Sequence, residues 1–133
     1  MKELSEKDAS VLEHIIRHCK IIADCLRRFG NDIASFKNDQ IFRDAVGMNI
    51  LQIGELVTHL SEEYLSDTKE QIPWRQIRAL RNIYAHTYEA VDDGRVWEVI
   101  NNDIPELQSF CEEQINQMKS DFDNDCDEDD LLL

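Results

Sequence analysis

The segment from Arg81 to Tyr88, RNIYAHTY, places an arginine, a histidine and two tyrosines within eight residues. An arginine can hold two phosphate oxygens at once and offset the negative charge that builds up in a transition state. A histidine, with an ordinary pKa of about 6.5, can remove a proton from a ribose hydroxyl or protonate a leaving oxygen. Asn82 follows Arg81 directly and could orient either group. Arg81, His86 and Asn82 together suit phosphodiester chemistry, which in this form needs no metal ion or other cofactor.

The spacing of Arg81 and His86 raises a geometric problem. On an ideal α-helix the two side chains are separated by about 140° around the axis, so one straight helix does not aim both at a single atom. Fraying at the helix end would redirect His86, and a symmetric dimer would bring two copies of the helix together across one cleft. The alternative is a helix end in which the arginine pairs with an acid and the histidine caps carbonyl groups.

Four apolar stripes with three- and four-residue steps predict four long helices. The first runs from about Ser5, a capping residue, to Gly30, a C-terminal cap. The second begins near Asp39, and the third begins at Pro73 and fades after His86. The fourth follows the loop 89–94, is capped by Asp92 or Asp93, and is expected to kink at Pro105. With only four Gly and two Pro in the chain, the sequence predicts an all-α, up-and-down bundle.

The second predicted helix carries residues that could link the fold to a site. Gly47 and Gly54 are seven residues apart and share a face, which indicates the close approach of another backbone. Neither glycine has an obvious partner within one subunit, so we expect a homodimer. Glu55 lies beside the apolar stripe, as a partly buried acid or a neighbour of the site. His59 is assigned to the apolar side of the helix, in a structural role.

Length and charge indicate one helical domain, residues 1–119, and an acidic tail, residues 120–133, that is expected to be disordered. Within the 133 residues, 14 Lys and Arg oppose 28 Asp and Glu, a net charge of −14, and seven of the acids lie in the last thirteen residues. Nucleic acid would therefore have to bind at a local basic site and not over a general basic face.

No apolar run approaches the roughly 20 residues of a membrane span. The first ten residues are mostly polar and lack the apolar core of a signal peptide, which favours a cytoplasmic protein. The cysteine spacings match no zinc site.

The pattern Arg81-x4-His86-x-Tyr88, with Asn82 after the arginine, resembles the R-x4-H-x-Y motif of HepT-like toxins in the HEPN superfamily. Its surroundings agree with this. The segment QIPWRQIRALRNIYAHTYEAVDDGRVWEVI resembles the family's Pro-Trp before the arginine, its His-x-Tyr and the tryptophan of the next helix. MNILQIGELV resembles its Ile-Gly-Glu on the preceding helix. The resemblance covers about residues 8–118.

The resemblance implies a four- or five-helix homodimer that cleaves RNA at a site in the dimer cleft. It puts Arg81 and His86 in the catalytic roles, with Asn82 in support. It also implies a partner, a minimal nucleotidyltransferase antitoxin, which silences the toxin by transferring AMP to the motif tyrosine, here Tyr88. Two other interpretations remain open: a non-catalytic helical dimer that binds such a nucleotidyltransferase, and a helical nucleotide-binding domain.

Overall fold

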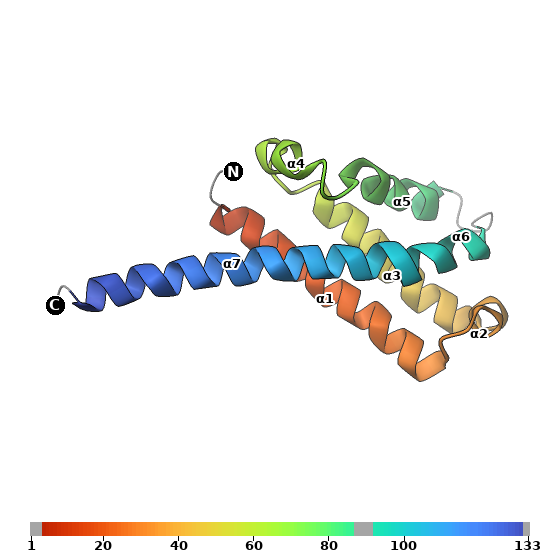
Figure 1. Cartoon of the computed structure of the whole chain (residues 1–133). Helices are drawn as coiled ribbons and strands as arrows, with labels where there is room; N and C mark the ends of the chain where they lie inside the picture. Colours follow the sequence, from red (N-terminus) through yellow and green to blue (C-terminus); the bar gives the residue numbers. More distant parts are fainter. Residues whose placement is uncertain (1–3, 87–91, 132–133) are drawn as a thin grey trace.

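The computed structural model describes the backbone of residues 4–86 and 92–131, and the side chains of residues 4–81 and 92–121. Every regular element in these ranges is helical, which confirms the predicted all-α class (Figure 1). In chain order they are α1 (Glu6–Phe29), α2 (Ile33–Asn38), α3 (Gln40–Val57), α4 (Glu62–Thr68), α5 (Trp74–His86), α6 (Asp93–Glu98), the π-helix η2 (Val99–Asp103) and α7 (Ile104–Leu131).

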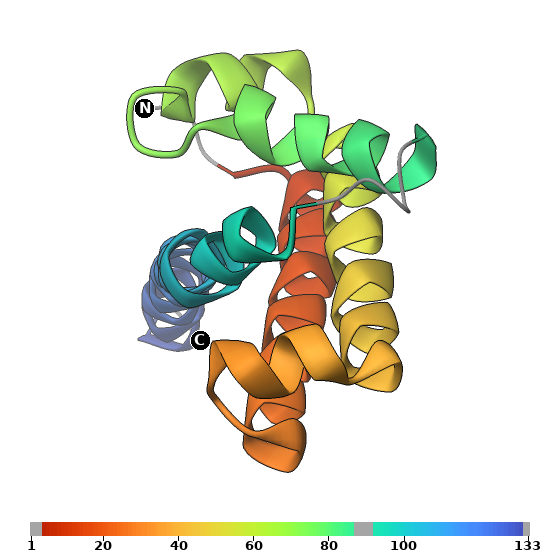
Figure 2. The ribbon, with the colours of Figure 1, turned by 90° about the vertical axis from the view of Figure 1, so that its right-hand side faces the viewer.

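The long helices enclose one apolar core. Helices α1 and α3 lie side by side and run in opposite directions, and α5 crosses the C-terminal end of α3 (Figure 2). Helix α7 packs against α1 on the other side. The core residues come from all of these elements, and the largest fully buried side chains are Phe36, Phe42, Leu12, Ile15, Ile22, Ile50, Ile53, Ile100 and Leu107.

The predicted helix ends are confirmed where a local cap defines them. The hydroxyl of Ser5 accepts a hydrogen bond from the backbone N–H of Asp8, and Gly30 ends α1 with a positive φ of 109° that favours glycine. Asp39 caps α3 through the N–H groups of Ile41 and Phe42. Of the two candidates for the cap of α6, it is Asp92 that accepts from the next turn.

Trp74 anchors the start of α5 and thereby sets the position of Arg81. The indole Nε1 donates to the hydroxyl of Thr68 at 2.8 Å, and Thr68 is fully buried. The indole ring also contacts the rings of Tyr64 and Phe110. Because residues of both α4 and α7 hold the tryptophan, the position of the first turn of α5 is fixed. The next turns of α5 then cross α3.

Asp8, in the first turn of α1, makes a contact with a distant part of the chain. Its carboxylate is buried and accepts from the backbone N–H of Ser61 at 2.8 Å and from the Ser61 hydroxyl at 2.7 Å. The first turn of α1 therefore holds the first turn of α4. This contact satisfies a buried carboxylate, which would otherwise be costly.

The π-helix η2 lies where the sequence predicts a kink at Pro105. The N–H of Ile104 bonds to the carbonyl of Val99, five residues earlier, instead of four. Pro105 has no N–H to donate and its ring crowds the carbonyl of Asn101, so the α-helical pattern cannot continue unchanged through this turn. The chain resolves the conflict with one wide turn between α6 and α7.

Two short helices lie between the long ones. In α2, Ile33 is exposed, whereas Phe36 is buried. Helix α4 extends to Thr68, which is buried. In both cases a short helix with its own N-terminal cap, Asp32 or Ser61, forms where the sequence shows no long apolar stripe.

The backbone of most of the acidic tail belongs to α7, which continues as a helix to Leu131. The disorder of the tail stays a prediction. The last turn of α7 contains no basic residue to offset the negative end of the helix dipole. Figure 1 shows that the C-terminal part of α7 extends beyond the other helices. The boundary between residues 119 and 120 stays a prediction.

Three cysteines are part of the core. Cys19, Cys25 and Cys111 are buried free thiols, and burial raises the pKa of Cys19 to about 12. These thiols are therefore protonated near neutral pH and pack as small apolar side chains. In the described helices, none combines the length and apolar character that a membrane span requires.

Candidate functional site

Arg81 and Glu55 form an ion pair where α5 crosses α3. The Arg81 Nη1 donates to the Glu55 Oε2 at 2.8 Å, and the two side chains are 36% and 51% exposed. Ion pairs at such exposed positions are worth at most about 1 kcal/mol, because water screens them. Glu55 can therefore orient the guanidinium without holding it so tightly that a phosphate could not replace it. Glu55 lies beside Arg81, and its role in the site stays a prediction.

Gly54 explains how Arg81 reaches this position. A Cβ atom added at Gly54 would lie 2.7 Å from the Cβ of Arg81 and 3.2 Å from its backbone nitrogen. The prediction of a close backbone approach is confirmed for Gly54. The partner, however, is α5 of the same subunit, so the argument for a dimer from an unpartnered Gly54 is wrong. Dimerisation stays a prediction that must rest on other observations.

Replacing Gly54 with alanine should displace α5 from α3. The new methyl group would contact backbone as well as side-chain atoms of Arg81, and overpacking of this kind typically costs about 1 to 3 kcal/mol. We expect a lower free energy of unfolding in urea and a misplaced guanidinium. Gln52→Ala, at an exposed position two residues earlier in α3, is the matched control and should leave stability nearly unchanged. An equally stable Gly54→Ala variant would show that α5 can shift at no cost.

The prediction that His59 lies on the apolar side of α3 is wrong, because the helix ends at Val57. Its side chain is 61% exposed, and its Nε2 lies 4.0 Å from the Glu55 Oε1. Of the histidines whose side chains the structure describes, it is thus the one beside the Arg81–Glu55 pair. The four-residue spacing of Glu55 and His59 is the signal in the sequence that could have indicated this contact.

The other motif residues are located by backbone alone or not at all. Asn82 and His86 belong to the last turns of α5, and His86 is its final residue, as the fading apolar pattern predicts. Their side chains and the whole of Tyr88 lie outside the described part of the chain. The structure thus brings Arg81 to Glu55 and Gly54. It leaves the convergence of Arg81, Asn82 and His86 as a prediction.

The described residues contain no cluster of three or more His, Cys, Asp or Glu side chains that could hold a metal ion.

The helix that carries the motif is positively charged, unlike the chain as a whole. Helix α5 contains three arginines, Arg75, Arg78 and Arg81, and no acidic residue, in a chain of net charge −14. This arrangement is suited to binding an anion.

Comparison with known proteins identifies the family. The sequence profile described as "Ribonuclease HepT-like" matches residues 12–114, which is most of the chain. The protein belongs to the ribonuclease HepT-like family. The resemblance deduced from the motif around Arg81 is thereby confirmed, and the match spans α3, α5 and most of α1, the elements that build the Arg81–Glu55 pair.

Among its relatives, a "Putative RNase" of Caldanaerobacter subterraneus subsp. tengcongensis is 29% identical over 108 residues, 81% of this chain and 94% of the relative. A "Gamma-glutamylcyclotransferase and putative RNase" of Methanocaldococcus jannaschii is 32% identical over 103 residues. The match covers 77% of this chain but 45% of that larger protein. A "Probable ribonuclease HepT" of Thermococcus cleftensis is 29% identical over 66 residues, 47% of this HepT-like chain and 60% of the relative. No solved structure matches significantly.

Proposed function

We propose that this HepT-like protein is a cytoplasmic RNA endonuclease, the toxin of a toxin–antitoxin pair, and that it cleaves without a metal ion. Membership of the ribonuclease HepT-like family and the names of its relatives support the ribonuclease activity. The observation that carries the proposal is the placement of Arg81. The motif arginine is half-exposed, oriented by Glu55 and fixed to α3 through Gly54.

In the proposed reaction, His86 removes the proton of a ribose 2′-hydroxyl, and the 2′-oxygen attacks the adjacent phosphorus. The bond between phosphorus and the 5′-oxygen breaks, and that oxygen takes up a proton, which a second His86 in a dimer could supply. The products are a 2′,3′-cyclic phosphate and a 5′-hydroxyl. Arg81 binds the non-bridging oxygens, whose negative charge grows in the transition state. Asn82 orients one of the two groups.

The charge of α5 supports RNA as the substrate. Arg75 and Arg78 are exposed, and within the described residues neither forms an ion pair. Arg78 lies about one turn and Arg75 about two turns before Arg81 on the same helix, so a single strand could place successive phosphates along α5. This local positive surface offsets the unfavourable net charge of the chain.

We also propose that the protein works as a homodimer through the exposed side of α3. Ile41 and Met48 are 70% and 57% exposed, although both are large and apolar. They are seven residues apart, and Glu55 follows seven residues later, so the three lie near one face of the helix. A second copy that covers this α3 stripe would bury the apolar side chains and bring the two Arg81–Glu55 pairs toward one cleft.

Met48→Glu should weaken this dimer, because it places a charge in the centre of the α3 stripe. We expect analytical ultracentrifugation at micromolar concentration to show mostly monomer for the variant and dimer for the wild type. RNA cleavage should fall along with the dimer fraction. Ser10→Glu, at an exposed position on α1, adds the same charge elsewhere and is the control. A wild-type protein that sediments only as a monomer would contradict the dimer.

The silencing step is the transfer of AMP to Tyr88 by a minimal nucleotidyltransferase encoded as the antitoxin. The adduct would add a bulky anion close to the motif arginine and exclude RNA. The second candidate function is a non-catalytic dimer that binds this nucleotidyltransferase. Incubation of the purified protein with single-stranded RNA in EDTA separates the two. Products with cyclic phosphate ends support the ribonuclease, whereas intact RNA favours the binding module.

A further inference from the structure

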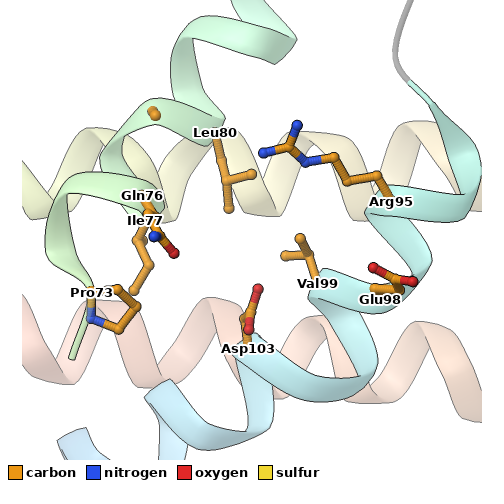
Figure 3. A pocket seen from close by; sticks show the side chains of 9 residues that line it. Pro73, Gln76, Ile77, Leu80, Arg95, Glu98, Val99 and Asp103 are labelled. Atoms are coloured by element: carbon orange, nitrogen blue, oxygen red, sulfur yellow. The ribbon is translucent and has the colours of Figure 1, made fainter. Parts of the chain in front are cut away.

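A small cavity lies between α5 and the turn formed by α6 and η2 (Figure 3). Its volume is about 210 Å³. That is below the about 300 to 1,000 Å³ of sites for drug-sized ligands, so a single small ring system suits it. One group of lining residues is apolar: Pro73, Ile77, Ala79, Leu80 and Val99. The other is polar: Gln76, Arg95, Glu98 and Asp103.

The polar groups of this cavity are available to a ligand. Within the described residues, the side chains of Gln76, Arg95, Glu98 and Asp103 form no hydrogen bond or ion pair with protein. Figure 3 shows the guanidinium of Arg95 reaching toward Leu80, and the Asp103 carboxylate directed into the space between Ile77 and Val99. Because Ile77 and Val99 are buried, the cavity has an apolar floor under a rim of donors and acceptors.

This combination selects one chemical class of ligand. Two carboxylates in the rim would repel a phosphate or another anion. The apolar floor disfavours a small polar solute, and the four polar side chains disfavour an aliphatic group. A nucleobase satisfies both parts, because its faces stack on apolar side chains or a guanidinium plane and its edge carries hydrogen-bonding groups.

The wide turn at Pro105 forms one wall of the cavity. Val99 and Asp103 are the first and last residues of η2, and both line the space. Single π-turns occur frequently at functional sites. Here the turn carries the apolar floor residue and the carboxylate on the same wall. The wide turn that Pro105 imposes thus places both residues at the cavity.

The cavity also has a fixed relation to the candidate reaction centre. Leu80 lines it, and the next residue, Arg81, lies on the flank of α5 that faces α3. Consecutive residues of a helix are about 100° apart around its axis, so the cavity and Arg81 lie on adjacent sides of α5.

We propose that this cavity binds the base of an unpaired nucleotide that flanks the cleaved phosphate, and that it prefers a base with an amino group. The proposal rests on the ribonuclease function proposed above. Carboxylates accept hydrogen bonds from exocyclic amino groups. Guanine offers an N–H and an amino group side by side to one carboxylate, whereas uracil has no amino group. Asp103 is the principal acceptor, and Arg95 covers the face of the base.

The test compares short single-stranded oligonucleotides that differ only in the base flanking the cleaved position, guanine or uracil. For the full-length wild type we expect kcat/KM to be about 10- to 100-fold higher with guanine, the range typical of one well-formed bidentate contact. Asp103→Asn should remove most of this preference, because kcat/KM for the guanine substrate should fall toward that for the uracil substrate. Arg95→Gln, also at an exposed position, should reduce binding of the guanine substrate. Glu106→Gln, an exposed acid in the next turn, is the matched control.

Binding of the same labelled oligonucleotides, measured by fluorescence anisotropy in EDTA, separates the two proposals. If no RNA is cleaved but guanine-dependent binding is lost in Asp103→Asn, the ribonuclease function fails and the base site stands. If RNA is cleaved with equal kcat/KM for both substrates, or if Asp103→Asn keeps the preference, the base site is overturned. It is also overturned if Asp103→Asn changes only the sedimentation of the protein or its binding to the nucleotidyltransferase. That result would assign the cavity to a protein partner.

Discussion

Replacing His86 with alanine is expected to lower the rate of metal-independent RNA cleavage by about 100- to 10,000-fold, the contribution of a general acid–base group. The helices should remain folded, because His86 is the last residue of α5 and, among the described side chains of that helix, Trp74, Ile77 and Leu80 contact the core. The measurement is the initial rate of cleavage of a labelled RNA in EDTA, with circular dichroism to verify the fold. His14→Gln, at an exposed position on α1, is the histidine control.

Arg81→Ala should lower the same rate by about 100- to 1,000-fold, as the loss of a positioned transition-state donor does. The binding of RNA should fall less than the rate, because Arg75 and Arg78 remain on α5. Arg81→Lys keeps the charge but not the forked geometry, so it should recover only part of the activity. If His86→Ala cleaves RNA as fast as the wild type, the enzyme interpretation fails and the non-catalytic binding module takes its place.

The parts of the fold that the sequence predicts well are those with a local physical cause. Ser5, Asp39 and Asp92 cap helices because a short polar side chain can accept from a backbone N–H two or three residues later in the same chain. Gly30 ends α1 because it adopts a positive φ. These causes need no knowledge of distant residues, so the bounds of α1 and the start of α3 follow from the sequence.

The parts that the sequence does not predict depend on contacts between distant segments. The spacing of Gly47 and Gly54 indicates a close approach, but nothing in it shows that Arg81 of the same subunit is the partner of Gly54. The bond between Asp8 and Ser61, 53 residues apart, is equally hidden behind the local capping pattern. Helix α3 ends at Val57, where the N–H and the hydroxyl of Thr58 donate to the carbonyl of Glu55, and no glycine or proline marks this end in the sequence.

In the candidate site, too, some features follow from the local sequence and others depend on tertiary packing. The motif identifies Arg81, His86 and Tyr88 by their spacing alone. The contact that orients Arg81 depends on where Glu55 lies when α5 crosses α3. The cavity beside Leu80 depends on η2, a wide turn for which Pro105 is the only sign in the sequence. Local patterns thus indicate the residues proposed to react, whereas tertiary packing decides what surrounds them.

Tyr88→Phe should separate the reaction from its regulation, because it removes only the phenol oxygen. That oxygen is the proposed nucleophile that takes AMP from ATP and releases pyrophosphate, so the variant cannot accept AMP there. Cleavage should persist, at least in part, since the proposed proton transfers use His86. Intact-mass spectrometry of the protein co-expressed with a cognate minimal nucleotidyltransferase should show an AMP-sized increase for the wild type and none for Tyr88→Phe.

Tyr84→Phe is the matched control, since it removes the same atom from the other tyrosine of the motif segment. This variant should be modified like the wild type and should lose its RNA cleavage when the nucleotidyltransferase is present. Tyr88→Phe should stay active under the same conditions, because no adduct adds negative charge near Arg81. An AMP-sized increase that persists in Tyr88→Phe but disappears in Tyr84→Phe would move the regulated position one helical turn closer to Arg81.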